Sequence, residues 1–135
     1  MLLLTDLKTY LTASPSATGA VPFKLGDMPD TPDLCICARE YPGEEGLQRF
    51  GSAGLQIIKP RLQFEVRSAE TDYLSADSLI QALYAKMNLI TPQMTWASGW
   101  TYLVVVALGP PFPLGRDDKR RYSMVVNYRF EIHTV

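Results

Sequence analysis

The chain has 135 residues, a mass of 15.1 kDa and a formal net charge of −1, from 13 basic and 14 acidic residues. A chain of this length can bury a sizeable core, and 47% hydrophobic with 20% charged residues is an ordinary globular composition. Proteins that hold nucleic acid through phosphate contacts usually carry a large basic excess, so DNA binding as a main task is not expected beyond a local patch.

The N-terminal part predicts one helix and two short strands. Residues 2–13 have a helical apolar stripe, which consists of Leu3, Leu4, Leu7, Tyr10 and Leu11. This stretch is too short for a membrane span and lacks the basic start of a signal peptide, so we expect a cytosolic protein in the producing cell. Strands are expected at residues 20–25 and 34–39. The loop between them, residues 26–33, contains two prolines, one glycine and three aspartates.

Two cysteines, Cys35 and Cys37, share one face of the predicted strand at residues 34–39. A disulfide between residues two apart would strain the backbone, so we interpret them as buried thiols. A metal-binding pair is the alternative. With His133 as the single histidine, a four-ligand zinc site would be hard to complete.

Residues 40–54 are expected to form a long loop because they contain four glycines and one proline. A brief strand near residues 47–50 is the one regular element predicted there. The glycine spacing fits neither the P-loop nor the dinucleotide-binding fingerprint. A surface or contact loop is therefore the better interpretation.

The central stretch, residues 61–87, changes its apolar period from two to between three and four. Leu62, Phe64 and Val66 alternate with polar residues, which predicts a strand with one buried face. The helix that follows has an apolar stripe at Tyr73, Ala76, Leu79, Ile80, Leu83 and Met87. Thr71 or Asp72 can cap its start, and Asn88 is the expected stop.

The C-terminal part predicts a hairpin, a long loop and a last strand. Strands at residues 93–97 and 100–108 flank the turn Ser98-Gly99, and three successive valines suggest a central strand covered on both faces. Residues 109–121 should be a loop because of their prolines and glycines. Residues 122–133 alternate again as one long strand. The sequence thus predicts a single α+β domain over 1–135, with a mixed, mostly antiparallel sheet, an N-terminal helix and one long amphipathic helix packed on one face.

The residues show no catalytic constellation. His133 has no triad-like neighbours, Glu44 and Glu45 point apart on an extended chain, and four basic residues surround Asp117 and Asp118. We therefore expect no enzyme activity, no cofactor and no metal. The alternating charges of the 109–121 loop suit a polar contact with another subunit, and the alternative is a solvated loop that touches nothing.

Two stretches carry a resemblance to a known family. The segment RLQFEVRSAETDYLSADSLIQALYAKM and the ending PLGRDDKRRYSMVVNYRFEI resemble the small tail-terminator and minor-capsid proteins of long-tailed bacteriophages. In these proteins a strand ending in VR leads into the long helix, and an LGRD-x-x-R loop leads into a last strand with an asparagine and aromatics, here Asn127, Tyr128 and Phe130. The resemblance covers residues 55–135 and extends to the N-terminal half by element order.

The resemblance implies a structural virion protein at the head–tail interface, assembled in the host cytoplasm. Such proteins form a ring, typically of six copies, that caps the tail tube, ends tail polymerisation and offers a surface for the head-side connector protein. Phage DNA would pass through the lumen without specific binding. The residues expected at subunit or partner contacts are Arg116, Asp117, Asp118, Arg120 and Arg121, followed by Arg61 and Arg67.

Two alternative functions remain at this point. One is a head-completion or connector-stopper protein of the same virion, which would also form a ring. The other is a small cellular ligand-binding or enzyme domain, which predicts a monomer or dimer with a pocket.

Overall fold

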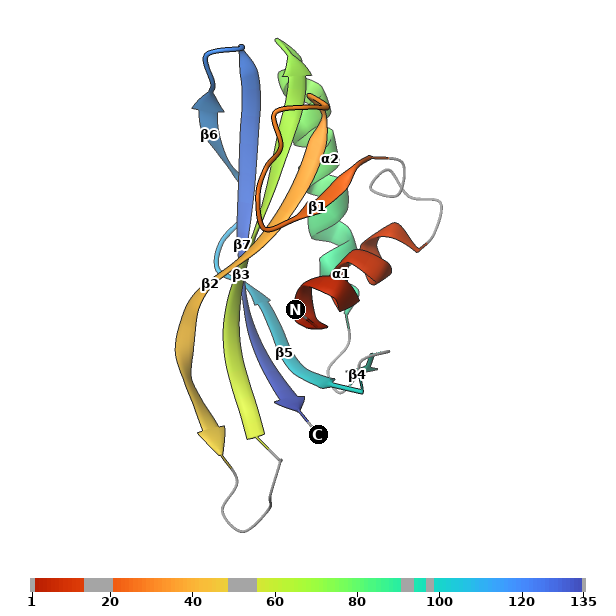
Figure 1. Ribbon diagram of the computed structural model, residues 1–135, viewed down its shortest axis with the longest axis vertical. Coiled ribbons are helices and arrows are strands. Elements are labelled where there is room, and N and C mark those ends of the chain that lie inside the picture. Colours follow the sequence, from red (N-terminus) through yellow and green to blue (C-terminus); the bar gives the residue numbers. More distant parts are fainter. Residues whose placement is uncertain (1, 14–20, 49–55, 91–93, 97–98, 135) are drawn as a thin grey trace.

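The computed structural model describes residues 2–13, 21–48, 56–90, 94–96 and 99–134, which form two helices and a seven-stranded sheet (Figure 1). The helices are α1 (Leu2–Thr12) and α2 (Tyr73–Met87). The strands are β1 (Phe23–Leu25), β2 (Cys35–Gln48), β3 (Gln56–Glu70), β4 (Met94–Thr95), β5 (Thr101–Ala107), β6 (Phe112–Arg116) and β7 (Arg121–Thr134).

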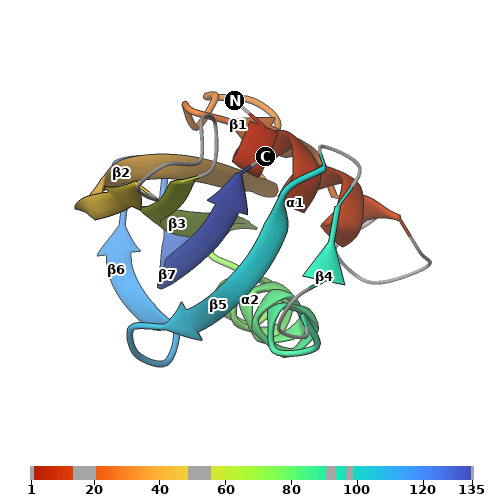
Figure 2. The ribbon, with the colours of Figure 1, turned by 90° about the horizontal axis from the view of Figure 1, so that it is seen from below.

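The strand order in the sheet is β1-β2-β3-β7-β5-β4. Strand β6 also pairs with β7, so β5 and β6 follow one another along the same edge of β7. Only β1 and β2 are parallel among the described pairs. The predicted class, an α+β fold with a mostly antiparallel sheet, is confirmed. Figure 2 shows how strongly this sheet curves.

The core lies between the sheet and the helices, as the two apolar periods predict. Leu62, Phe64 and Val66 of β3 are fully buried, and their alternation with polar residues leaves the other face of the strand open. Strand β7 repeats this pattern with Met124, Val126, Tyr128, Phe130 and Ile132. The stripe of α2 packs against β3 and β7 through Ala76, Leu79, Ile80, Leu83 and Met87.

Helix α2 begins and ends where its caps predict. The side chain of Asp72 accepts a hydrogen bond from the backbone N–H of Ser75 at 3.2 Å, which satisfies one free donor of the first turn. Asn88 is the C-cap residue. Its N–H donates to the Tyr84 carbonyl at 3.1 Å, and the Leu89 N–H donates to the Lys86 carbonyl at 3.1 Å.

Helix α1 is fixed by its apolar stripe and by polar contacts at its middle and near its C-terminal end. Leu3, Leu7 and Leu11 are at most 1% exposed. The Tyr102 hydroxyl on β5 donates to Asp6 Oδ2 at 3.3 Å, and the Tyr10 hydroxyl donates to the Lys86 carbonyl at 3.0 Å. No helix in the described part of the chain is long and apolar enough to cross a membrane.

The prediction of a loop at residues 40–54 is wrong for residues 40–48. Residues 40–48 continue β2, which pairs with β3 through two irregularities of register. Gly43 lies at the first of these, and a Cβ atom there would collide with the Lys59 carbonyl oxygen. Glycine therefore marks a close approach of two strands rather than a loop. Residues 49–55 lie outside the described residues.

Two further expectations about the C-terminal part are corrected. Residues 112–116, expected within a loop, form the edge strand β6, where prolines are tolerated because an edge leaves donors unused. Strand β5 is not covered on both faces, since Val106 is 42% exposed on the side away from the helices.

The thiols of Cys35 and Cys37 are free and buried, as predicted. They lie on β2 opposite Arg67 and Glu65 of β3. Burial raises the pKa of both thiols, because the thiolate form loses hydration there. Burial and the raised pKa both favour the neutral thiol form of these residues.

Candidate functional site

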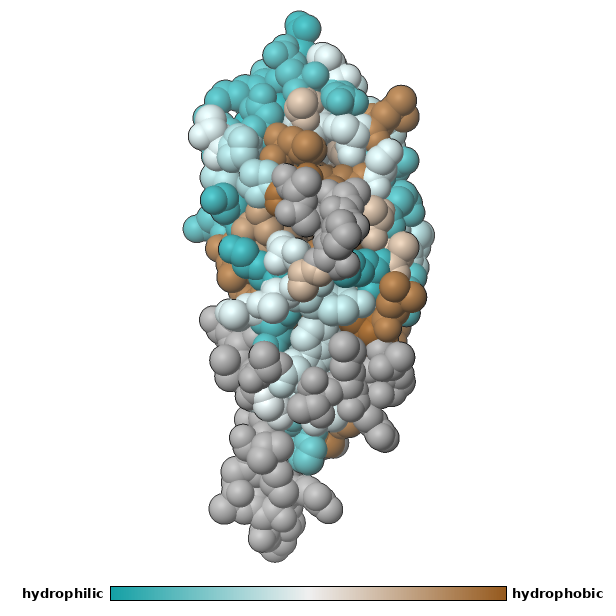
Figure 3. All heavy atoms as spheres, turned by 90° about the vertical axis from the view of Figure 1, so that its right-hand side faces the viewer, coloured by the Kyte–Doolittle hydropathy of each residue, from teal (hydrophilic) through white to brown (hydrophobic). Residues whose placement is uncertain are grey.

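Charged residues from three separate segments meet at one end of the sheet, at the top of Figure 1. The segments are the β1–β2 connection at residues 26–34, the β6–β7 turn at residues 117–121, and the β3–α2 junction at residues 67–72. We call this region the charged end. Figure 3 shows that its surface on the helix side is mainly hydrophilic, with hydrophobic residues in small groups.

Arg121, the first residue of β7, is the centre of the charged end and is only 5% exposed. Its guanidinium donates to Asp117 Oδ2 at 2.8 Å, to Asp33 Oδ1 at 3.1 Å and to Asp30 Oδ1 at 3.2 Å. It also donates to the Asp30 carbonyl at 2.7 Å. One cation thus holds carboxylates from two segments that lie about ninety residues apart in sequence.

Arg67, on β3, fixes the same loop through its backbone. It is also 5% exposed, and its guanidinium donates to the carbonyls of Asp33 at 2.9 Å, Pro32 at 2.7 Å and Asp30 at 3.2 Å. These oxygens belong to a loop with no strand partner, so the arginine supplies hydrogen bonds that a ladder would otherwise give. Together Arg67 and Arg121 attach the β1–β2 connection to the end of the sheet.

Asp117 builds the β6–β7 turn. Its Oδ1 accepts from the backbone N–H of Arg121 at 2.9 Å and of Lys119 at 3.0 Å. The Arg121 N–H bond, followed by the Arg121 guanidinium, holds the pKa of Asp117 below its ordinary value. The pKa of Asp30 is lowered as well, first by the hydrogen bond from Lys119 Nζ at 2.6 Å and then by Arg121. Both aspartates are therefore anionic at neutral pH.

The β3–α2 junction is tied to this turn by backbone and hydroxyl contacts. Thr71 N–H donates to the Arg120 carbonyl at 2.9 Å, and both residues have positive φ, 57° and 60°. The buried Ser68 hydroxyl accepts from the Tyr122 N–H at 2.9 Å, where β3 and β7 fall out of register. Two non-glycine residues thus hold a left-handed conformation at one contact, which indicates a turn determined by its surroundings.

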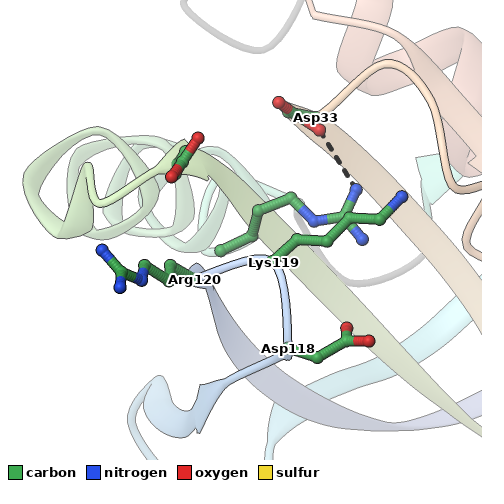
Figure 4. A pocket seen from close by; sticks show the side chains of 6 residues that line it. Asp33, Asp118, Lys119 and Arg120 are labelled. Atoms are coloured by element: carbon green, nitrogen blue, oxygen red, sulfur yellow. Dashed lines mark hydrogen bonds and ion pairs between the residues drawn. The ribbon is translucent and has the colours of Figure 1, made fainter.

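A hollow of about 340 Å³ opens at the charged end, lined by Asp33, Glu70, Asp118, Lys119, Arg120 and Arg121. Figure 4 shows Arg120 and Asp118 pointing to opposite sides of the turn. In the described part of the chain, no cluster of three or more histidine, cysteine, aspartate or glutamate residues could hold a metal ion. The hollow is mixed in charge and offers hydrogen-bonding groups of both signs, which suits a polar contact.

The structure places the predicted contact residues in three different situations. Arg116, Asp118 and Arg120 are exposed at the charged end. Arg67, Asp117 and Arg121 lie beneath them in the intrachain contacts described above. Arg61 is half-buried in the middle of β3, six residues or roughly 20 Å along the strand from Arg67. The role of these residues in subunit contacts stays a prediction.

Asp30 and Asp33 were not among the predicted site residues, although both bind Arg121. The signal in the sequence was the concentration of aspartates in residues 26–33, which predicted a loop but named no partner. The partner could not be found from local pattern because the contact joins distant segments.

A second polar network covers the sheet face away from the helices. Arg39 on β2 forms an ion pair with Glu65 at 2.9 Å and donates to Gln63 Oε1 at 3.1 Å, and Gln63 in turn donates to Asn127 Oδ1 at 3.1 Å. The network crosses β2, β3 and β7. It is a hydrogen-bonded surface rather than a binding pocket.

Comparison with known protein families agrees with the sequence resemblance. The profile of a family described as bacteriophage tail terminator protein matches residues 7–134, which is nearly the whole chain. No curated relative matches the sequence. The chain therefore belongs to the bacteriophage tail terminator family and is a structural protein of the phage tail.

Proposed function

We propose that the protein forms a ring, of about six copies, that caps the tail tube, ends tube polymerisation and presents a joining surface to the head-side connector. Membership of the tail terminator family supports this proposal. A terminator must contact both its own copies and the tube.

The charged end is the observation that carries the proposal. The exposed side chains of Arg116, Asp118 and Arg120 stand on a turn held by Asp117 and by the buried Arg121. A turn fixed in this way loses little conformational freedom on binding, and its alternating charges select one register of approach. We assign the contact with another copy or with the tube to these three exposed residues. Arg67, Asp117 and Arg121 would support them from within the chain.

The passage of DNA follows from the ring. A chain with a net charge of −1 gives a ring without the basic excess that would hold phosphates. DNA would then slide through the lumen without specific binding.

The experiment adds purified protein to polymerising tube protein of the same phage and measures tube lengths by electron microscopy. We expect tubes to stop growing and to carry a cap of density at one end. The double variant Asp118→Arg with Arg120→Asp should no longer stop tube growth, so the tubes should again be long. Lys24→Glu, which changes an exposed charge on β1, should act like wild type. Binding to the portal-side ring without any effect on tubes would instead establish a head-completion protein.

A further inference from the structure

Large hydrophobic side chains are exposed at eight positions in the described part of the chain. Six of them fall in two groups. The first, which we call the strip, consists of Val106, Leu108, Phe112 and Leu114 on β5, β6 and their connection. The second, which we call the helix-start patch, consists of Tyr73 and Leu74 in the first turn of α2. Exposed groups of this kind mark contact surfaces more often than single exposed residues do.

The strip is exposed at the edge of the sheet, where β6 pairs with β7. All five residues of β6 are exposed, and Leu114 is 58% exposed. Phe112 and Val106 pair with Val125 and Arg129 of β7, which places both on the face away from the helices. Strand β6 therefore contributes apolar surface that is exposed to water.

The free edge of β6 is poorly suited to accept another strand. Pro111 and Pro113 have no N–H to donate, and proline at an edge is a common device against strand addition. A partner of the strip must therefore bind its side chains rather than extend the sheet.

The two groups differ in the charges around them. From Val104 to Arg116 the chain has one basic residue, Arg116 itself, and no acidic residue. From Glu70 to Ala85 it has three acidic residues, Glu70, Asp72 and Asp77, and no basic one. The strip thus ends at the exposed Arg116, directly before the charged turn. Glu70 and Asp72 precede the helix-start patch, and Glu70 shares the hollow of the charged end with Lys119 and Arg120.

We propose that the strip of one copy packs on the helix-start patch of the next copy, with Arg116 beside Glu70. Arg116 and Glu70 are both exposed and have opposite charges, which favours this pairing. The contact joins two different surfaces, so it is a head-to-tail contact of the kind that closes rings. The inference rests on the proposed ring and adds the surfaces that make it.

The first test replaces one apolar residue in each surface, by Leu114→Asp and Leu74→Asp. Leu89→Asp is the matched control, because Leu89 is 71% exposed against 74% for Leu74 and lies outside both surfaces. We expect each surface variant to weaken self-association by at least about tenfold and the control to match wild type. The measurement is mass by light scattering over a range of concentrations, repeated on tube ends by electron microscopy.

The second test mixes the two variants. Each keeps one intact surface, so an equimolar mixture should give a one-to-one dimer that neither variant forms alone. This dimer also shows that both variants are folded. The charge exchange Arg116→Glu with Glu70→Arg should restore assembly that either change alone weakens.

The outcomes separate this pairing from the ring itself. If the wild type is a monomer in solution and forms no ring on tube ends, the ring and the pairing would both be overturned. If the wild type forms a ring and either Leu114→Asp or Leu74→Asp still forms it, the pairing alone would be overturned. A mixture of the two variants that stays monomeric would have the same meaning.

Discussion

The charged end and the strip are neighbours along the chain, but their side chains have opposite surroundings. Those at the centre of the charged end are paired within the chain, and those of the strip are exposed to water. At the charged end, Arg121 is buried among three carboxylates of its own chain. Immediately before it, β6 exposes Phe112 and Leu114 to water. The most conspicuous charges in a sequence therefore need not be the ones available to a partner.

The two regions also differ in what they can contribute to assembly. Ion pairs already made within the chain add little when a second copy arrives, because their partners are satisfied. Apolar surface left in water contributes about 25 cal/mol for every Å² that a contact buries. We therefore expect the ion pairs of the charged end to determine the stability and shape of this end of the protein. Its exposed charges would select the register of a contact, and the strip would supply affinity.

The largest expected effect comes from removing the centre of the charged end. Arg121→Ala should lower the free energy of unfolding by about 2–3 kcal/mol, because several charge-assisted hydrogen bonds are lost at once. Arg120→Ala, at the adjacent exposed arginine, should change it by less than about 0.5 kcal/mol. Denaturant titration followed by circular dichroism measures both, and equal effects at the two positions would break the comparison.

A smaller effect should follow from acid, through the two aspartates whose pKa is lowered. A carboxylate with a depressed pKa in the folded state stabilises the fold above its ordinary pKa, here 3.8, and this contribution is lost as the pH falls below that value. Wild type should thus lose stability between about pH 5 and about pH 3. Asp117→Asn should lose less over this interval, since one of the titrating groups is absent. A wild type and a variant with the same pH dependence would contradict the assignment.

The elements that sequence predicted well are those whose pattern is local. The helix at Tyr73–Met87 and the strand from Arg121 show their period within one segment, because each buries a single face against the same core. The caps at Asp72 and Asn88 also depend on contacts three or four residues away. These could be derived without knowledge of the fold.

The parts that sequence missed depend on distant partners. Residues 40–48 look like a loop in composition, yet pairing with β3 makes them a strand, since tertiary context overrides weak β-propensity. The contact between Asp30 and Arg121 spans 91 positions, so no local pattern announces it. The charges at residues 116–121 were recognised, but which of them face inward could not be inferred without the loop that covers Arg121.

A still smaller effect tests whether the turn of the charged end is determined by its surroundings. Thr71 has a φ of 57°, which is unfavourable for a β-branched residue and tolerated by asparagine. Thr71→Asn should therefore raise the free energy of unfolding by about 0.5–1 kcal/mol and leave tube capping unchanged. A stabilised protein that no longer caps tubes would show that the strained junction has a role in function rather than in shape alone.

The smallest effect on stability is expected in the strip, where it sharpens the comparison most. Val106→Thr keeps the β-branched shape and replaces one methyl group by a hydroxyl on a side chain that is 42% exposed. We expect the free energy of unfolding to change by less than about 0.5 kcal/mol, because water already reaches this group. Self-association should nevertheless weaken measurably by light scattering, since the hydroxyl would lose hydration in the contact. Thermal melts and light scattering on the same samples separate the two quantities. A change in stability without a change in association would place Val106 in the fold alone and outside the contact between copies.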